Sequence, residues 1–199
     1  MRKIDQAFEL FDKYNEQDPF IFKWKGKNYP QEYFLAKQLH KWVLTLDPGA
    51  SEELQLASRC QHIGRWEISR KRYPEGRKGY LTWRRQLAVL HADTAAGILK
   101  QVEYDEGLIS RVRQIILKQK IKTDQDVQTM ENALCLVFLQ FQYEDFFNRY
   151  SSEKIVGILR KSLLKMDDEG RRQALSLSYS PTGRQYIEEA LKLILDKSN

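Results

Sequence analysis

Three histidines and a dense run of arginines are the residues in this chain with the clearest capacity for chemistry. His40, His62 and His91 are its only histidines, and the segment 59–85 around the second of them holds nine Lys and Arg residues but only two acids. An imidazole can bind a metal ion or carry a proton near neutral pH, and guanidinium groups bind phosphate with paired hydrogen bonds. Together these residue types indicate a site for a phosphate-bearing ligand.

The positive charge of the chain is local. The formal net charge is +6, yet segment 59–85 alone carries +7 and the remainder −1. A local excess favours a discrete anion site over a uniformly basic surface, although a solvated basic loop is the alternative. Arginine outnumbers lysine seven to two in this segment, which favours planar, bidentate recognition of phosphate. The residues expected to bind the ligand are Arg59, Arg65, Arg77, Tyr80, Arg84 and Arg85.

The histidines fall on three separate predicted helices or helix ends, and at least one of them faces inward. His91 has Leu87 four residues before it and Ala95 four residues after it, which is the spacing of one apolar helix face. A buried imidazole must form a hydrogen bond or bind a metal. A hydrogen bond to a carbonyl group would satisfy any one of these imidazoles. A shared ligand or metal site would account for the presence of all three. Glu131 lies on a similar apolar face and needs a cation, either an arginine or a metal.

Helical periodicity runs through most of the chain and predicts an all-α fold. The expected helices cover 2–16, 31–46, 51–61, 80–100, 105–118, 124–149, 151–164 and 185–195, with a short helical piece before the last. Residues 19–30 read as a turn-rich linker and 65–79 as a loop, and no strand is expected. We therefore expect one domain over 1–199, with the N-terminal helix and linker in 1–28 and the C-terminal helices in 151–199.

Composition excludes several classes of protein. A hydrophobic content of 42% and an aromatic content of 12% are typical of a folded chain. Two cysteines, Cys60 and Cys135, cannot build a disulfide framework, and no apolar run reaches the ~18 residues of a membrane span. The N-terminus resembles no targeting signal, so we expect a cytoplasmic protein without a membrane partner. Glycine-rich phosphate loops, cysteine zinc patterns and serine nucleophile elbows are all missing from the sequence.

One short motif resembles a known family. Gln61-His62-Ile63-Gly64-Arg65 is similar to the HDIGK signature of HD-domain phosphohydrolases, which are all-α metal enzymes. The wider pattern of QHIGRWEI, YPEGRKGYLTWR, LHAD and ENALCLVFLQ resembles an uncharacterised HD-like family of bacteria and fungi, described only as a domain of unknown function. This resemblance covers roughly residues 5–190. It implies a compact helical HD-like bundle of about seven to nine helices.

The resemblance also implies a metal site and a catalytic role for two residues. His40, His62, His91 and Glu131 would supply a set of three nitrogens and one oxygen, suited to a divalent ion such as Zn, Mn, Fe or Ni. Gln61 and Glu67 of QHIGRWEI would take part in the catalytic step. Two positions depart from the HD pattern, since Gln61-His62 stands where the family has His-Asp, and Asn132 lies where a carboxylate is expected.

The sequence thus supports competing functions. The first is a metal-dependent phosphohydrolase that acts on a nucleotide or another small phosphorylated compound, with a metal-bound water as nucleophile. The alternative is a metal-free, degenerate HD scaffold that binds nucleotide or RNA. A third reading is a structural protein whose basic stretch meets an acidic partner surface.

Overall fold

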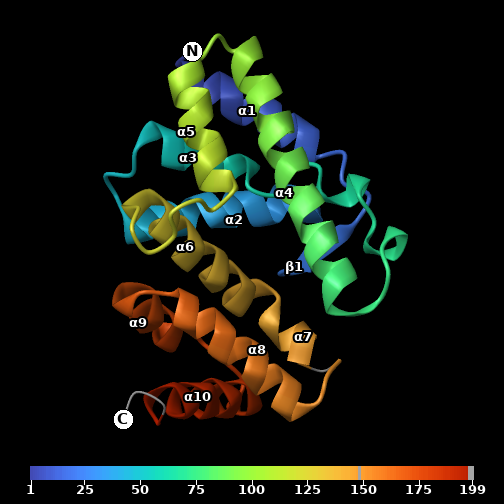
Figure 1. Ribbon diagram of the computed structural model, residues 1–199, viewed down its shortest axis with the longest axis vertical. Coiled ribbons are helices and arrows are strands. Elements are labelled where there is room, and N and C mark those ends of the chain that lie inside the picture. The colour runs from blue at the N-terminus through green and yellow to red at the C-terminus, as the bar shows by residue number, and fades with distance from the viewer. Residues whose placement is uncertain (148, 197–199) are drawn as a thin grey trace. The chain divides into compact units, whose positions relative to one another are not determined.

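The chain folds almost entirely into helices, which confirms the predicted all-α class (Figure 1). The structure is a computed structural model, and it describes residues 1–147 and 149–196. It divides into two compact units, Met1–Ile121 and Lys122–Asn199. The single HD-like domain expected over 1–199 stays a prediction.

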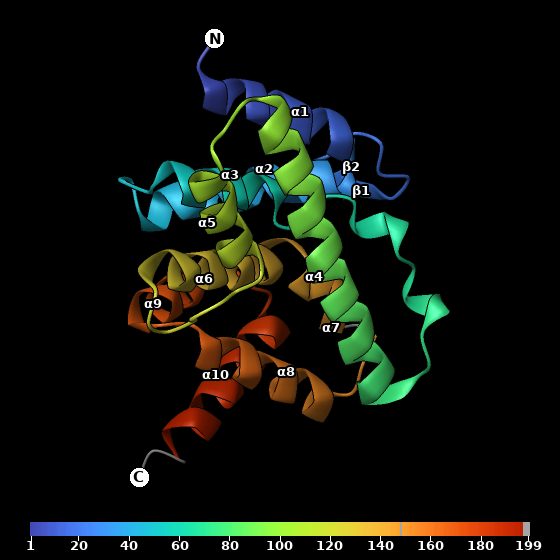
Figure 2. The same cartoon turned by 45° about the horizontal axis from the view of Figure 1, so that its top comes forward.

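A short central helix organises the first unit. The helices of this unit are α1 (Lys3–Asn15), α2 (Gln31–Leu46), α3 (Glu52–Cys60), α4 (Gly76–Gln101) and α5 (Glu106–Ile116). Helix α3 contacts α1, α2 and α5, and α4 packs on α5 and α1 (Figure 2). Six of the nine residues of α3 are buried, so it lies in the core although it is short. The residues that follow it are therefore held from several sides.

Helix α3 begins where the sequence predicts. The Ser51 hydroxyl accepts a hydrogen bond from the Leu54 amide at 3.1 Å, and Glu52 and Glu53 stand in the first turn. A capping hydroxyl satisfies one of the free amides at a helix start, and acidic residues there interact favourably with the helix dipole. The same kind of cap begins α5, because the Asp105 carboxylate accepts from the Leu108 amide at 3.0 Å.

A β-hairpin replaces the expected linker between the first two helices. Strands β1 (Ile21–Trp24) and β2 (Lys27–Pro30) pair in antiparallel register around Lys25-Gly26, both of which have positive φ. The prediction that the chain has no strand was therefore wrong for this segment. The strands are only four residues long, too short for a clear alternating pattern, and tertiary packing supports them. Phe22 of β1 stacks on Phe34 of α2, with ring centroids 4.7 Å apart.

The basic loop is more ordered and shorter than predicted. It contains two single-turn 3-10 helices, η1 (Arg65–Glu67) and η2 (Arg70–Arg72), and α4 begins at Gly76 rather than at Tyr80. The Trp83 indole on α4 donates a hydrogen bond to the Ile68 carbonyl at 2.8 Å and so fastens the loop to the helix. Tyr80, which the sequence places at the start of this helix, therefore lies one turn inside it.

The second unit is a set of five described helices without strands. They are α6 (Gln125–Phe141), α7 (Tyr143–Phe147), α8 (Ser152–Lys165), α9 (Asp168–Ser176) and α10 (Pro181–Leu195). The helix predicted over 124–149 is interrupted at Gln142, whose φ of −126° is not helical. Tyr143 follows this break, is fully buried and donates a hydrogen bond to the Gly183 carbonyl at 3.0 Å. This long-range bond explains the interruption, which helical periodicity alone does not show.

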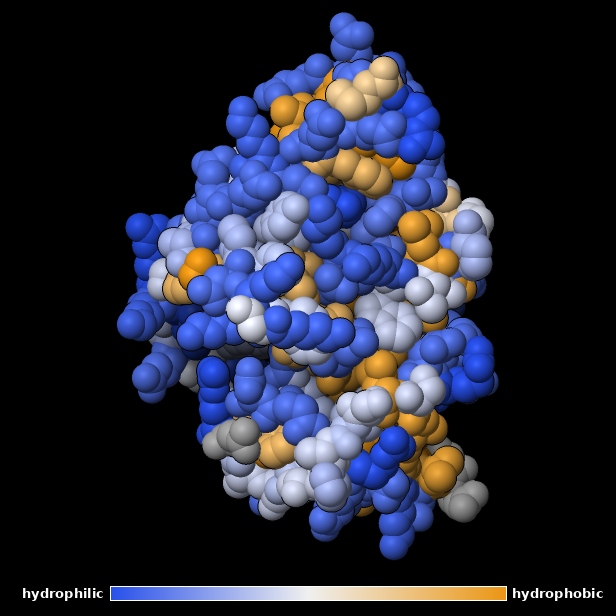
Figure 3. Space-filling view, turned by 180° about the vertical axis from the view of Figure 1, so that it is seen from behind, coloured by the Kyte–Doolittle hydropathy of each residue, from blue (hydrophilic) through white to orange (hydrophobic). Residues whose placement is uncertain are grey.

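Most of the face drawn in Figure 3 is hydrophilic, with apolar side chains in small groups. Among the residues that the structure describes, no helix combines the length and the apolar character that a membrane crossing needs. This agrees with the absence of a long apolar run in the sequence.

Two glycines of α4 provide a test of the loop packing. A Cβ on Gly79 would lie 2.0 Å from the Pro74 carbonyl oxygen, whereas one on Gly97 would meet nothing within 4 Å. We expect Gly79→Ala to lower the free energy of unfolding by about 1–3 kcal/mol, because the loop must move away. Gly97→Ala should raise it by roughly 0.5–1 kcal/mol through helix propensity. Urea denaturation of both variants measures this, and a Gly79→Ala protein as stable as the wild type would contradict the packing described.

Candidate anion-binding site

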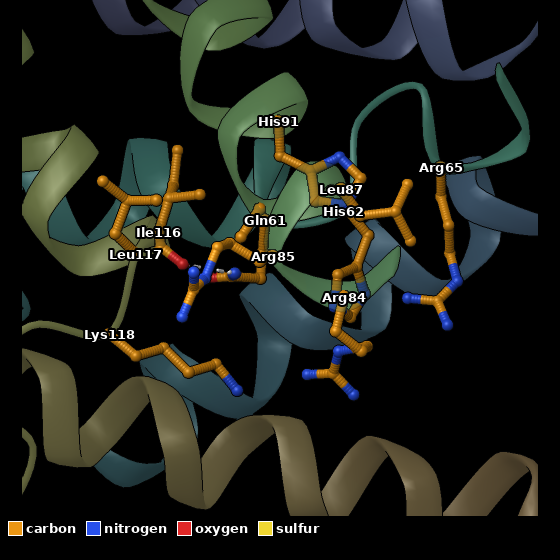
Figure 4. A pocket seen from close by; sticks show the side chains of 11 residues that line it. Gln61, His62, Arg65, Arg84, Arg85, Leu87, His91, Ile116, Leu117 and Lys118 are labelled. Atoms are coloured by element: carbon orange, nitrogen blue, oxygen red, sulfur yellow. Dashed lines mark hydrogen bonds between the residues drawn. The ribbon is translucent and has the colours of Figure 1, made fainter. Parts of the chain in front are cut away.

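A pocket of about 210 Å³ lies beside the end of α3, within the first unit (Figure 4). Its walls come from the residues that follow α3, from the middle of α4 and from the C-terminal end of α5. The lining residues are Gln61, His62, Arg65, Arg84, Arg85, Leu87, Ala88, His91, Ile116, Leu117 and Lys118. Gln61 and His62 thus reach the pocket directly from the end of the buried helix α3, and residues of α4 and of the end of α5 form the other walls.

Four of these lining residues are cationic, and none of the eleven is acidic. In Figure 4 the side chains of Arg84 and Lys118 extend toward each other from opposite sides of the pocket. The Arg84 guanidinium also donates to the Tyr80 hydroxyl at 3.2 Å. Like charges gathered around one concave surface create a positive potential that attracts anions. The charge of the lining therefore favours an anion over a cation or a neutral ligand.

Two imidazoles share this pocket and stay neutral. The ring centroids of His62 and His91 are 5.7 Å apart, and His91 Nδ1 lies 2.6 Å from the Ile63 carbonyl oxygen. Burial lowers the pKa of His91 to about 4. Burial and the nearby Arg65 charge also hold the pKa of His62 well below its usual value. At neutral pH both rings can therefore exchange hydrogen bonds with a ligand without adding charge.

A buried carboxyl group, that of Glu32, contacts two residues of the pocket lining from outside the pocket. Glu32 of α2 is almost fully buried, with Oε1 3.7 Å from Arg65 Nε and Oε2 4.0 Å from His62 Nδ1. Burial raises its pKa to about 7, although the Arg65 charge opposes this shift. Glu32 lies against both Arg65 and His62, so it positions them without lining the pocket. Sequence reasoning missed it, although Leu35 and Leu39 give it the same apolar helix face that singled out Glu131.

The three histidines do not share one cavity. His40 Nδ1 lies 3.0 Å from the Ser58 hydroxyl, and its ring packs edge-on against Phe8 at 5.0 Å. It lines a different hollow, beside residues of α1. Burial and the Arg59 charge lower its pKa to about 4. The hydrogen-bonded core histidine is therefore the better description of His40, because Ser58 and Phe8 hold it on another side of α3.

Glu131 belongs to the second unit, where it has a cation partner. Its Oε1 lies 3.1 Å from Lys165 Nζ. The neighbouring Asn132 accepts hydrogen bonds from the Gln128 side chain and from the Asp167 amide. Sequence reasoning expected Glu131 to need a cation, and Lys165 is a cation that it meets in this unit. Asn132, in turn, serves as a structural acceptor at the start of α9.

Four other residues expected at the site lie outside the pocket lining. Arg59 is buried against Phe8 and forms an ion pair with Asp12, because α3 turns that side chain toward α1. Glu67 accepts a hydrogen bond from the Tyr14 hydroxyl at 2.5 Å. Arg77 and Tyr80 are exposed on α4. Of the predicted ligand-binding residues, Arg65, Arg84 and Arg85 are the ones that the structure brings together.

The pocket does not fit the metal site that the resemblance implied. Within the described residues, no three His, Cys, Asp or Glu side chains are grouped so that they could hold one ion. The pocket offers His62 and His91, but Gln61 donates its amide hydrogen to the Ile116 carbonyl at 3.0 Å, and Glu32 faces Arg65. Two imidazoles fall short of the three or more ligands typical of catalytic sites. Lys118 and Ile116, which the sequence did not single out, complete the wall.

The raised pKa of Glu32 predicts a pH-dependent stability. Because the folded state keeps the Glu32 proton up to about pH 7 and the unfolded state loses it near pH 4.5, stability should fall as pH rises between these values. Glu32→Gln lacks this effect. The unfolding free energy of the variant relative to wild type should therefore increase by about 3 kcal/mol from pH 4.5 to pH 8.

Denaturant unfolding at several pH values measures the difference, with Glu9→Gln on the exposed face of α1 as the control. The Glu9→Gln difference should stay flat across this range. If the Glu32→Gln difference is equally flat, the carboxyl group titrates normally and does not support the pocket as described.

Comparison with known proteins gives one match. A family model described as "Domain of unknown function (DUF4202)" matches residues 5–187. No curated protein matches the chain. No solved structure matches it either. The match covers nearly the whole chain, including the pocket and both units, so this chain is a member of the DUF4202 family.

Proposed function

We propose that the first unit binds a small phosphorylated compound, such as a sugar phosphate or a nucleotide, in the pocket beside α3. The observation that carries this proposal is the set of lining residues, in which Arg65, Arg84, Arg85 and Lys118 come from three separate segments and meet no acidic lining residue. Phosphate is the common biological anion that guanidinium groups bind most specifically.

The four cationic residues differ in how firmly neighbouring side chains fix them, and this difference suggests separate roles in binding. Arg65 faces the buried Glu32 and lies over the Trp83 ring, 5.4 Å from its centroid, so it is already oriented and partly neutralised. Arg84 and Arg85 are exposed on α4. We infer that these two arginines, with Lys118, supply most of the charge that a dianionic phosphate requires, and that Arg65 fixes its orientation.

Pocket size favours a small ligand. Its volume of about 210 Å³ lies below the ~300–1,000 Å³ common for drug-sized ligands. A phosphate group with a short carbon chain or one sugar would fill it. A nucleotide would place its phosphate and sugar inside and leave its base toward solvent.

The proposal predicts which arginines matter for binding. We expect the double variant Arg84→Ala/Arg85→Ala to weaken binding of ribose 5-phosphate and AMP at least tenfold, since hydrogen bonds to charged groups contribute about 1.5–3 kcal/mol each. Isothermal titration calorimetry measures the affinities. The control is Arg72→Ala, which removes an exposed arginine of the same basic stretch outside the pocket.

Arg72→Ala should bind both compounds like the wild type. Equal losses in the control and the pocket variant would indicate nonspecific attraction to a basic surface. Tight binding of RNA that Arg72→Ala or Arg77→Ala abolishes, without any effect of the pocket variant, would instead favour the RNA-binding alternative.

Hydrolysis of the bound phosphate ester is our second proposal. Its basis is the pair of neutral imidazoles beside the anion site, since a neutral imidazole can accept the proton of an attacking water. The HD-like relationship belongs to this proposal, as does a divalent metal that such enzymes use for nucleophile activation. Because the residues of the pocket do not form a three-ligand metal site, we assign no step to a metal.

Phosphate release tests this second proposal. Wild-type protein should release inorganic phosphate from small phosphate esters, and His62→Gln should slow the release about 10²-fold, the usual effect of losing a general base. Parallel assays with a chelator and with added Zn²⁺, Mn²⁺, Fe²⁺ or Ni²⁺, together with elemental analysis of the purified protein, show whether a metal takes part. A protein that binds these esters and leaves them intact under every condition is a binding protein and no hydrolase.

A further inference from the structure

Gln61, which lines the pocket, carries a buried amide oxygen without a hydrogen-bond partner among the described residues. Gln61 is 3% exposed, and its Nε2 donates to the Ile116 carbonyl at 3.0 Å. A carbonyl can only accept, so this bond fixes the orientation of the amide and turns Oε1 away from Ile116. Within the described part of the chain, Oε1 is buried and receives no hydrogen bond. A buried acceptor left in this state is costly, and a donor from a ligand would relieve it.

His91 supplies a second acceptor in the same pocket. Its Nδ1 lies 2.6 Å from the Ile63 carbonyl oxygen, which again can only accept, so Nδ1 carries the proton. Burial lowers the pKa of His91 to about 4, and the ring is neutral at physiological pH. Its Nε2 therefore holds a lone pair. Like Gln61, His91 is almost fully buried and belongs to the pocket lining.

The position of Gln61 distinguishes it from other buried polar groups. Asn15 Oδ1 and Arg59 Nε also lack partners among the described residues, but neither of these side chains lines the pocket. An unpartnered atom alone would therefore indicate only imperfect packing. Gln61 combines such an atom with a place in the pocket lining, which it shares with a second acceptor, His91, and with four cationic residues.

The polar lining thus has two chemically different parts. Arg65, Arg84, Arg85 and Lys118 only donate and are positively charged, which suits phosphate oxygens. Gln61 Oε1 and His91 Nε2 only accept in the states described, which disfavours a phosphate oxygen and suits an O–H or N–H group. Both parts belong to the one pocket that Figure 4 draws.

We infer that the ligand of this pocket is a phosphate ester that also bears a free hydroxyl group, of the sugar-phosphate or polyol-phosphate class, and that this hydroxyl donates to Gln61 and His91. The inference rests on the proposed function, because the cations must first hold the phosphate. It adds specificity, since the cations alone would accept any small phosphate.

Two compounds of equal charge and chain length test the inference. Glycerol 3-phosphate carries two hydroxyl groups, and propyl phosphate carries none. Calorimetric titration of the wild-type protein should show glycerol 3-phosphate binding at least tenfold more tightly. Equal affinities would overturn the inference and leave the phosphate site standing. If neither compound nor inorganic phosphate binds, the proposed function itself fails.

Substitution of Gln61 connects this preference to the acceptor. Gln61→Met keeps the length of the side chain and removes the amide oxygen, so the ratio of the two affinities should fall several-fold toward one. The matched control is Gln128→Met, which removes another buried amide, one that donates to the Lys165 carbonyl in the second unit. The control should keep the wild-type ratio.

A ratio that Gln61→Met leaves unchanged would contradict the assignment of the acceptor. If Gln61→Met does not fold, the comparison of the two compounds on wild-type protein still decides the inference. A general loss of stability would weaken both compounds alike and would not change their ratio.

Discussion

Burial of α3 in the first unit is the constraint on which the pocket depends. This helix is short, but it contacts α1, α2 and α5, and most of its residues are buried. Gln61 and His62 follow its last residue directly, so their positions are set by core packing on three sides. Loop residues alone would not hold a pocket floor in place. Here a core helix does so, and the basic loop needs only to bring Arg65 over it.

The pKa shifts of Glu32 and His62 are also consequences of burial in the first unit. Glu32, Arg65 and His62 form a linked group in which the carboxyl pKa rises and the imidazole pKa falls, both mainly because water is excluded. The two shifts have a common effect on the pocket, since each favours the neutral form of its group. Arg65, Arg84, Arg85 and Lys118 supply the positive charge of the pocket lining. Burial thus favours the neutral forms of the imidazole and carboxyl groups, whereas the arginine and lysine residues of the pocket lining carry positive charge.

Sequence periodicity and capping residues predicted most of the helices, because these signals are local. The bounds of α2 agree with the predicted 31–46, and α3, α5 and α6 begin one residue after the predicted starts at 51, 105 and 124. The hairpin 21–30 and the break before Tyr143 were missed, because both depend on partners far along the chain. Phe34 supports the first and Gly183 the second.

The candidate site was predictable in its charges and less so in its geometry. The local excess of arginine pointed to Arg65, Arg84 and Arg85, which do line one pocket. Arg59 was expected there because it lies one turn before His62, but α3 ends between the two residues, and Arg59 turns toward Asp12. Nothing in the sequence marked Lys118 as a site residue, since basic residues are common at the ends of helices. Its part in the pocket comes from the packing of α5 on α3.

The contacts of Gln61 and His62 show what these two residues do in place of the His-Asp pair of the HD signature. Where that signature has two metal-binding residues, Gln61 uses its amide to bond the Ile116 carbonyl, and His62 faces the carboxyl group of Glu32. Each side chain is thus engaged in a way that favours hydrogen bonding over metal binding. The cations around them do not depend on a metal for their effect on phosphate. In the proposed function the cations therefore bind the phosphate group without a metal, and the neutral acceptors of Gln61 and His91 set the selectivity among phosphate esters.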